Sequence, residues 1–99
     1  MTKNTRQITA IIAICVERIF QDQKYGKIDA GGEHTLGEWL LVLERELAEA
    51  KEALIKGGTG RDEIMSEIIQ IAAVALAAIE QYGVGPVKIT GFINSSKGD

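Results

Sequence analysis

The sequence has very little of several residue types, and each shortage excludes a class of protein. One proline among 99 residues is too few for a linker-rich or disordered chain. Cys15 is the only cysteine, so neither an intrachain disulfide nor a cysteine-based metal cluster can form. The net charge is −3 and no basic run is present, so we expect no nucleic-acid binding. These features favour a single globular, cytoplasmic protein.

Long apolar segments are also missing. The longest apolar stretch, residues 68–79, is interrupted by Gln70 and is shorter than the ~18 residues of a transmembrane helix, so we expect no membrane contact. Two basic residues precede "ITAIIAICV" as they do in a secretory signal. However, a cleavage site requires small residues at its flank, whereas Ile14 precedes Cys15, and the amphipathic pattern continues through Phe20. We therefore predict a first helix at this position.

The apolar residues recur at helical spacing in three segments, over about residues 5–24, 36–56 and 62–83. The third segment is apolar nearly all round, so it should be surrounded by other helices. The predicted fold is all-α, an antiparallel bundle of three main helices completed by homodimerisation. We place a single helical domain at residues 1–83 and a C-terminal arm at residues 84–99.

Short signals mark the ends of the predicted helices. Thr35 followed by Glu38 is a capping box at the start of the second helix. Gly57 and Gly58 supply a left-handed end to the same helix. Asp62 is the predicted N-cap of the third helix.

The second helix carries two carboxylates beside an apolar seam. The seam repeats at steps of four and three residues and consists of Leu36, Leu40, Leu43, Leu47, Ala50 and Leu54. Glu46 and Glu49 are one turn apart and flank this seam. They share a second face of the helix with Trp39, Val42 and Ala53.

The third helix presents Glu67 and Gln70 on one face. Carboxylates that converge from two helices repel each other unless a cation lies between them, and Mg²⁺ prefers oxygen ligands. One hypothesis is therefore a metal site between the second and third helices. The alternative is that the acids of the second helix form ordinary surface ion pairs with Arg45 or Lys51.

The motif "ELAE" at residues 46–49, followed after 17 residues by "EIIQ" at residues 67–70, resembles the E-x-x-E…E-x-x-D signature of MazG-type all-α nucleoside triphosphate pyrophosphohydrolases. The stretches "ERIFQDQKYG" and "HTLGEWL" precede it in the order found in small phage and bacterial members of that group. The resemblance covers residues 17–82.

The resemblance implies a homodimer, or a dimer of dimers, that uses Mg²⁺, with Mn²⁺ as a substitute, to cleave a nucleotide into a nucleoside monophosphate and pyrophosphate. Carried over by position, Glu46, Glu49 and Glu67 would be metal ligands, and one of them would orient or deprotonate the attacking water. Gln70 would be the fourth ligand, in the position of the family Asp. An amide oxygen brings no negative charge, so the alternative is a non-catalytic nucleotide-binding or regulatory dimer. A purely structural bundle is the third hypothesis.

Four further residues are candidates for substrate binding. Lys24, with Gln21 one turn before it, would reach phosphates from the end of the first helix, and Lys51 is a weaker candidate of the same kind. Trp39 would stack on a base, although a core position is its alternative. His34, the only histidine, lies in a glycine-bearing loop, which excludes the E-x-x-H pattern of di-iron bundles.

Overall fold

The computed structural model describes residues 2–25, 33–57 and 60–85. These ranges contain three helices and no strand: α1 (Lys3–Tyr25), α2 (Leu36–Lys56) and α3 (Arg61–Tyr82). The all-α prediction is therefore confirmed. Gly58 and nearly all of the predicted C-terminal arm lie outside the described residues.

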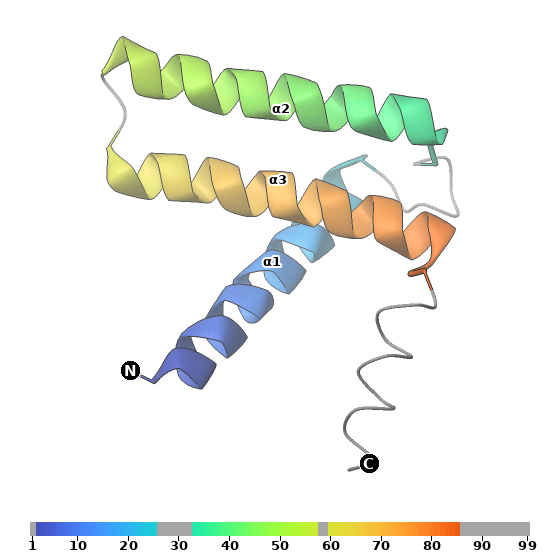
Figure 1. Cartoon of the computed structure of the whole chain (residues 1–99), viewed down its shortest axis with the longest axis horizontal. Helices are drawn as coiled ribbons and strands as arrows, with labels where there is room; N and C mark the ends of the chain where they lie inside the picture. The colour runs from blue at the N-terminus through green and yellow to red at the C-terminus, as the bar shows by residue number, and fades with distance from the viewer. Residues whose placement is uncertain (1, 26–32, 58–59, 86–99) are drawn as a thin grey trace.

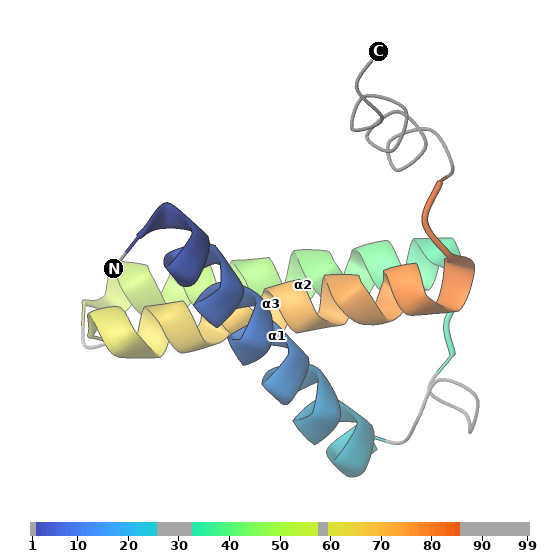
Figure 2. The same ribbon diagram turned by 90° about the horizontal axis from the view of Figure 1, so that it is seen from below.

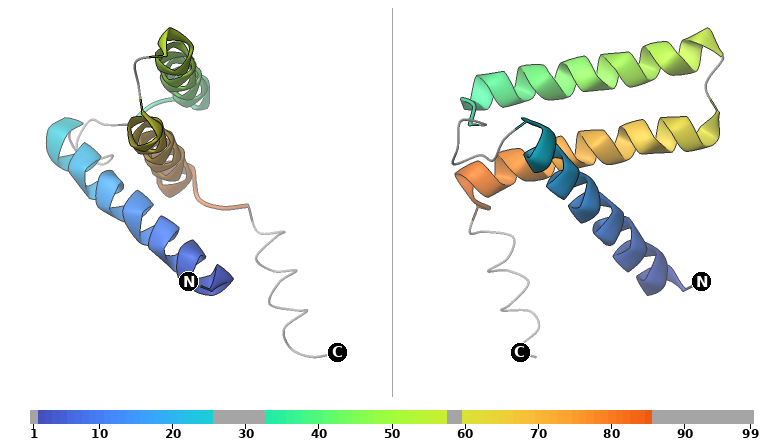
Figure 3. Two further views of the ribbon diagram at one scale, coloured as in Figure 1. Left: turned by 90° about the vertical axis from the view of Figure 1, so that its left-hand side faces the viewer. Right: turned by 180° about the vertical axis from the view of Figure 1, so that it is seen from behind.

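The three helices do not all run antiparallel. α2 and α3 form an antiparallel pair that lies side by side (Figure 1), whereas α1 crosses α3 obliquely (Figure 2). α3 packs against both other helices, and no comparable interface joins α1 to α2. Seen along the α2–α3 pair, α3 lies between its two neighbours (Figure 3). The prediction of a central third helix is confirmed, and the antiparallel arrangement holds for α2 and α3 only.

Local chemistry explains the ends of α2. The main-chain N–H of Glu38 donates to the Thr35 hydroxyl at 3.1 Å, and the main-chain N–H of Thr35 donates to Glu38 Oε1 at 2.7 Å. These two bonds form the predicted capping box. At the other end, Gly57 has φ 73°, a left-handed conformation that glycine adopts without steric cost.

The start of α3 differs from the prediction. Gly60 is the N-cap, in an extended conformation and without a side-chain cap, and the helix begins at Arg61. Asp62 therefore lies inside the first turn, where its carboxylate still interacts favourably with the helix dipole. Its assignment as the N-cap was wrong because the extended backbone ends two residues earlier.

The core of a single chain is very small. The buried apolar residues are Trp39, Ala50, Ala73 and Ala77, and among the described residues no large side chain is fully buried. α2 buries Trp39 and Ala50, and Leu43 is half-buried, whereas Leu36, Leu40, Leu47 and Leu54 of the predicted seam are exposed. The seam is therefore covered within the chain only at Leu43 and Ala50.

The exposed side of α1 is also apolar. Its exposed side chains include Ile8, Ile11, Ile12 and Ile19. α1 is attached to α3 by Arg18, which is buried and pairs with Glu80 at 3.0 Å and with Asp22. None of the three described helices is long and apolar enough to cross a membrane.

Candidate functional site

The acids predicted to act together come from two packed helices. Glu46 lies on α2 with 23% of its side chain exposed, and Glu67 is half-buried on α3. Burial raises the pKa of Glu46 most, and the negative charge of Glu49 raises it further; Arg45 opposes this, and Glu67 adds the smallest increase. The three carboxylates are thus close enough for their charges to interact.

These charges have little compensation from nearby cations. Glu46 contacts Arg45 Nη2 at 3.9 Å, a pair in which the arginine is mostly exposed and therefore contributes little. Within the described ranges, Glu49 and Glu67 form no ion pair, and neither does Lys51. Of the ion pairs that the alternative hypothesis predicts, the described residues therefore show only the contact between Glu46 and Arg45.

The donor types suit a hard cation, but one chain does not bring them into a ligand cluster. Three carboxylates and the amide of Gln70 offer the oxygen ligands that Mg²⁺ takes in proteins. Within residues 2–25, 33–57 and 60–85, however, no three Asp, Glu, His or Cys side chains are grouped closely enough to hold a metal ion. The carboxylates are neighbours, and binding a metal would require their side chains to converge.

Helix α1 reaches the same region through Gln21. Its amide Nε2 donates a hydrogen bond to the main-chain carbonyl of Gln70 at 3.2 Å, and its side chain is half-buried. Gln21 is therefore not a solvated residue at a helix end. Lys24 follows one turn later, in the last turn of α1, and is exposed.

Trp39 is part of the core and not an open stacking surface. It is 6% exposed, and its indole N–H donates to Gln81 Oε1 at 2.8 Å. Gln81 also accepts from the main-chain N–H of His34 at 3.1 Å and donates to the His34 carbonyl at 2.7 Å. The His34 ring meets Trp39 edge-on, with ring centres 4.7 Å apart. We call these three residues the Gln81 clamp; it joins the start of α2 to the end of α3.

Sequence reasoning overlooked Gln81 and Arg18. Arg18 shares its face of α1 with the polar Gln21 and Asp22, so its spacing did not single it out. Gln81 continues the buried row of Ala73 and Ala77 on α3, and a polar residue at a packed position requires a partner. That signal was available in the sequence. It does not identify the partner, because Trp39 is 42 residues from Gln81 and Arg18 is 62 residues from Glu80.

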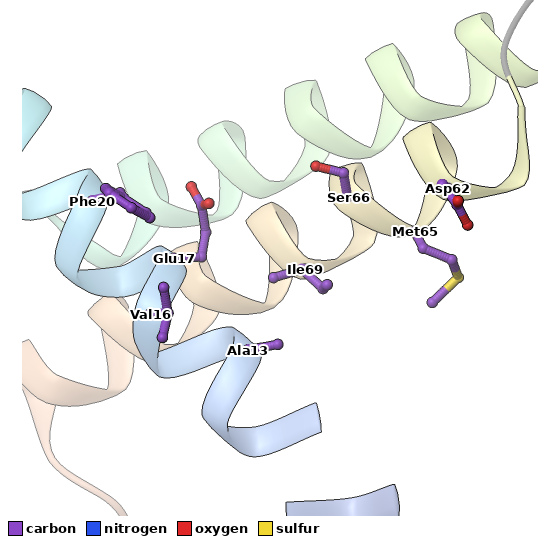
Figure 4. A pocket seen from close by; sticks show the side chains of 8 residues that line it. All are labelled: Ala13, Val16, Glu17, Phe20, Asp62, Met65, Ser66 and Ile69. Carbon is purple, nitrogen blue, oxygen red and sulfur yellow. The ribbon is translucent and has the colours of Figure 1, made fainter. Parts of the chain in front are cut away.

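A second feature lies between α1 and α3. It is an open hollow of about 520 Å³ (Figure 4). The lining residues are Ala13, Val16, Glu17, Phe20, Asp62, Met65, Ser66 and Ile69. Glu17 is half-buried and has no hydrogen bond or ion pair to any described residue. It was not among the predicted site residues, although it lies one turn before Gln21.

Comparison with known proteins gave no match for this chain among family models, curated proteins or solved structures. The resemblance to the MazG-type enzymes therefore stays a prediction from the sequence motif.

Proposed function

We propose that this protein is a Mg²⁺-dependent nucleotide pyrophosphohydrolase of the MazG type, active in the cytoplasm. It would convert a ribo- or deoxyribonucleoside triphosphate to the monophosphate and pyrophosphate. The observation that carries the proposal is the proximity of Glu46, Glu49 and Glu67: burial raises the pKa of Glu46, repulsion from the other two acids raises it further, and the ion pair that Glu46 forms with Arg45 is long. A divalent cation would remove that repulsion.

Each residue of the constellation has a chemical task. Glu46, Glu49, Glu67 and Gln70 would hold the metal, which when bound neutralises negative charge on the phosphates. Glu46 would also orient or deprotonate the attacking water. Gln21, held at the Gln70 carbonyl, would orient the substrate from α1.

The proposed active form is a homodimer. The leucine seam of α2 and the outer face of α1 leave large apolar side chains exposed in one chain, including Leu36, Leu54 and Ile11. A chain of this size depends on burying apolar surface for stability, and a second copy offers the missing cover. The same association would restrict the acidic side chains and help them converge on a metal.

The test is pyrophosphate release from a panel of ribo- and deoxyribonucleoside triphosphates, with Mg²⁺ or Mn²⁺ and with EDTA. We expect release that depends on metal and falls by about a hundredfold or more in Glu46→Ala, because a proton acceptor and metal ligand is lost. Glu44→Ala is the matched control, since Glu44 is an exposed acid on the same helix. Equal activity in the two variants would contradict the proposed site.

The alternative is a non-catalytic nucleotide-binding dimer, which Gln70 favours because an amide supplies no charge for the metal. In that case the wild type would release no pyrophosphate with any nucleotide. Activity that appears only in Gln70→Asp would show that the fold was kept while the chemistry was lost.

A further inference from the structure

The open hollow between α1 and α3 has apolar walls on which a planar ring could stack. Val16 and Phe20 of α1 and Ile69 of α3 form apolar walls (Figure 4). Phe20 is 59% exposed, so one face of its ring is available for stacking. A volume of about 520 Å³ falls within the range of small-molecule sites.

The polar groups of the hollow are acceptors. Glu17 from α1 and Ser66 from α3 lie on the same edge of it in Figure 4. Glu17 is half-buried, and its carboxylate accepts no hydrogen bond and forms no ion pair within the described residues. A ligand that brings two N–H donors would give both of its oxygens a charge-assisted partner.

The hollow also adjoins the carboxylate constellation. Ser66 precedes Glu67 directly and is one turn from Gln70, and Glu17 is one turn from Gln21, which is bonded to Gln70. Glu17 lines the hollow from α1, whereas the acids proposed to hold a metal lie on α2 and α3.

We propose that this hollow binds the nucleobase of the substrate and that Glu17 selects guanine. Guanine carries two adjacent donors, N1–H and the 2-amino group, which match the two oxygens of a carboxylate. Adenine and cytosine place a ring-nitrogen acceptor beside their single amino group, and uracil and thymine have one N–H between two carbonyl acceptors. Each of these arrangements turns a lone pair toward the carboxylate. The link to catalysis rests on the proposed function, whereas base binding does not.

The test measures binding of dGMP, dAMP, dCMP and dTMP to the full chain by calorimetry, without added metal. We expect dGMP to bind at least about tenfold more tightly than the others, because sites that hydrogen-bond a ligand reject analogues without the donors. Glu17→Gln should remove that preference, since an amide offers one acceptor in place of two. Asp62→Asn is the matched control: Asp62 also lines the hollow, but it is exposed and paired with Arg61.

The outcomes separate this proposal from the proposed function. Preference for dGMP that is lost only in Glu17→Gln supports the base site, even if no triphosphate is hydrolysed. Hydrolysis with the same base preference in wild type and Glu17→Gln overturns the base site and leaves the pyrophosphohydrolase standing. No binding of any nucleotide would overturn the proposal. A fall in the assembly mass of Val16→Asp would then mean that a second copy covers the hollow. Melting temperatures of all variants check that each is folded.

Discussion

The side-chain amide of Gln21 donates a hydrogen bond to the main-chain carbonyl of Gln70, with 3.2 Å between nitrogen and oxygen. This bond joins α1 to the face of α3 that carries Glu67. The Arg18–Glu80 pair is a second polar attachment of α1 to α3. The Gln21 bond is the one that lies beside the candidate site.

Gln21→Leu tests this contact. Loss of the hydrogen bond should lower the free energy of unfolding by about 0.5–1.5 kcal/mol, measured by urea denaturation. The substitution should also lower kcat/KM for pyrophosphate release, because the Gln21 amide proposed to orient the substrate is lost. Gln23→Leu, an exposed change on the same helix, should leave both quantities unchanged. Equal effects of the two substitutions would refute a positioning role for Gln21.

Gln81→Leu should destabilise the protein through the Gln81 clamp. The substitution strands the buried indole N–H of Trp39 and the main-chain N–H of His34, each of which donates to Gln81 Oε1. An unsatisfied buried donor costs about 1–3 kcal/mol. Trp39→Phe removes the indole donor and leaves Gln81 its bonds to His34. The free energy lost with the indole hydrogen bond should therefore appear when Trp39→Phe is made in the wild type and not when it is made in Gln81→Leu. Additive losses in the double variant would contradict the clamp.

Glu46→Gln should change the pH dependence of stability. The pKa of Glu46 is raised above its ordinary 4.5 in the folded chain, first by burial and then by Glu49, so the folded state holds this proton more tightly than the unfolded state. The stability that protonated Glu46 contributes is fully present below pH 4.5 and is lost as the pH rises through the pKa of Glu46 in the folded chain. The variant should therefore melt at a higher temperature than the wild type at pH 7 and at the same temperature near pH 3.5. Glu44→Gln should show no such divergence, and a variant less stable at pH 7 would rule out charge crowding.

Leu40→Glu tests the homodimer. Leu40 belongs to the exposed seam, whereas Leu41, equally exposed at 65% against 68%, does not. We expect a wild-type mass of twice 10.7 kDa by light scattering and a shift toward the single chain in Leu40→Glu. A charge in an apolar interface costs free energy on association, so the dimer dissociation constant of Leu40→Glu should be more than about tenfold that of the wild type. Leu41→Glu should remain dimeric. A monomeric wild type would contradict the proposal that the seam is the dimer interface.

The chemistry of the candidate site was only partly predictable from the sequence. Helical spacing placed Glu46 and Glu49 on the face of α2 shared with Trp39, and their charge interaction with Glu67 follows from the packing of α2 on α3. Glu17 was overlooked because its importance depends on a hollow formed by two helices. Spacing along one helix carries no information about such a hollow.

The presence of three helices and the two ends of α2 were determined by the sequence alone. The capping box at Thr35, the left-handed Gly57 and the periodic apolar residues act through neighbours within about four positions, so their effect needs no tertiary contact. Tertiary structure decided which part of α2 is buried, since Trp39 and Ala50 are buried whereas Leu36, Leu40, Leu47 and Leu54 are exposed. It also decided how α1 crosses α3. These outcomes depend on partners distant along the chain, and local spacing does not specify which of two apolar faces will meet them.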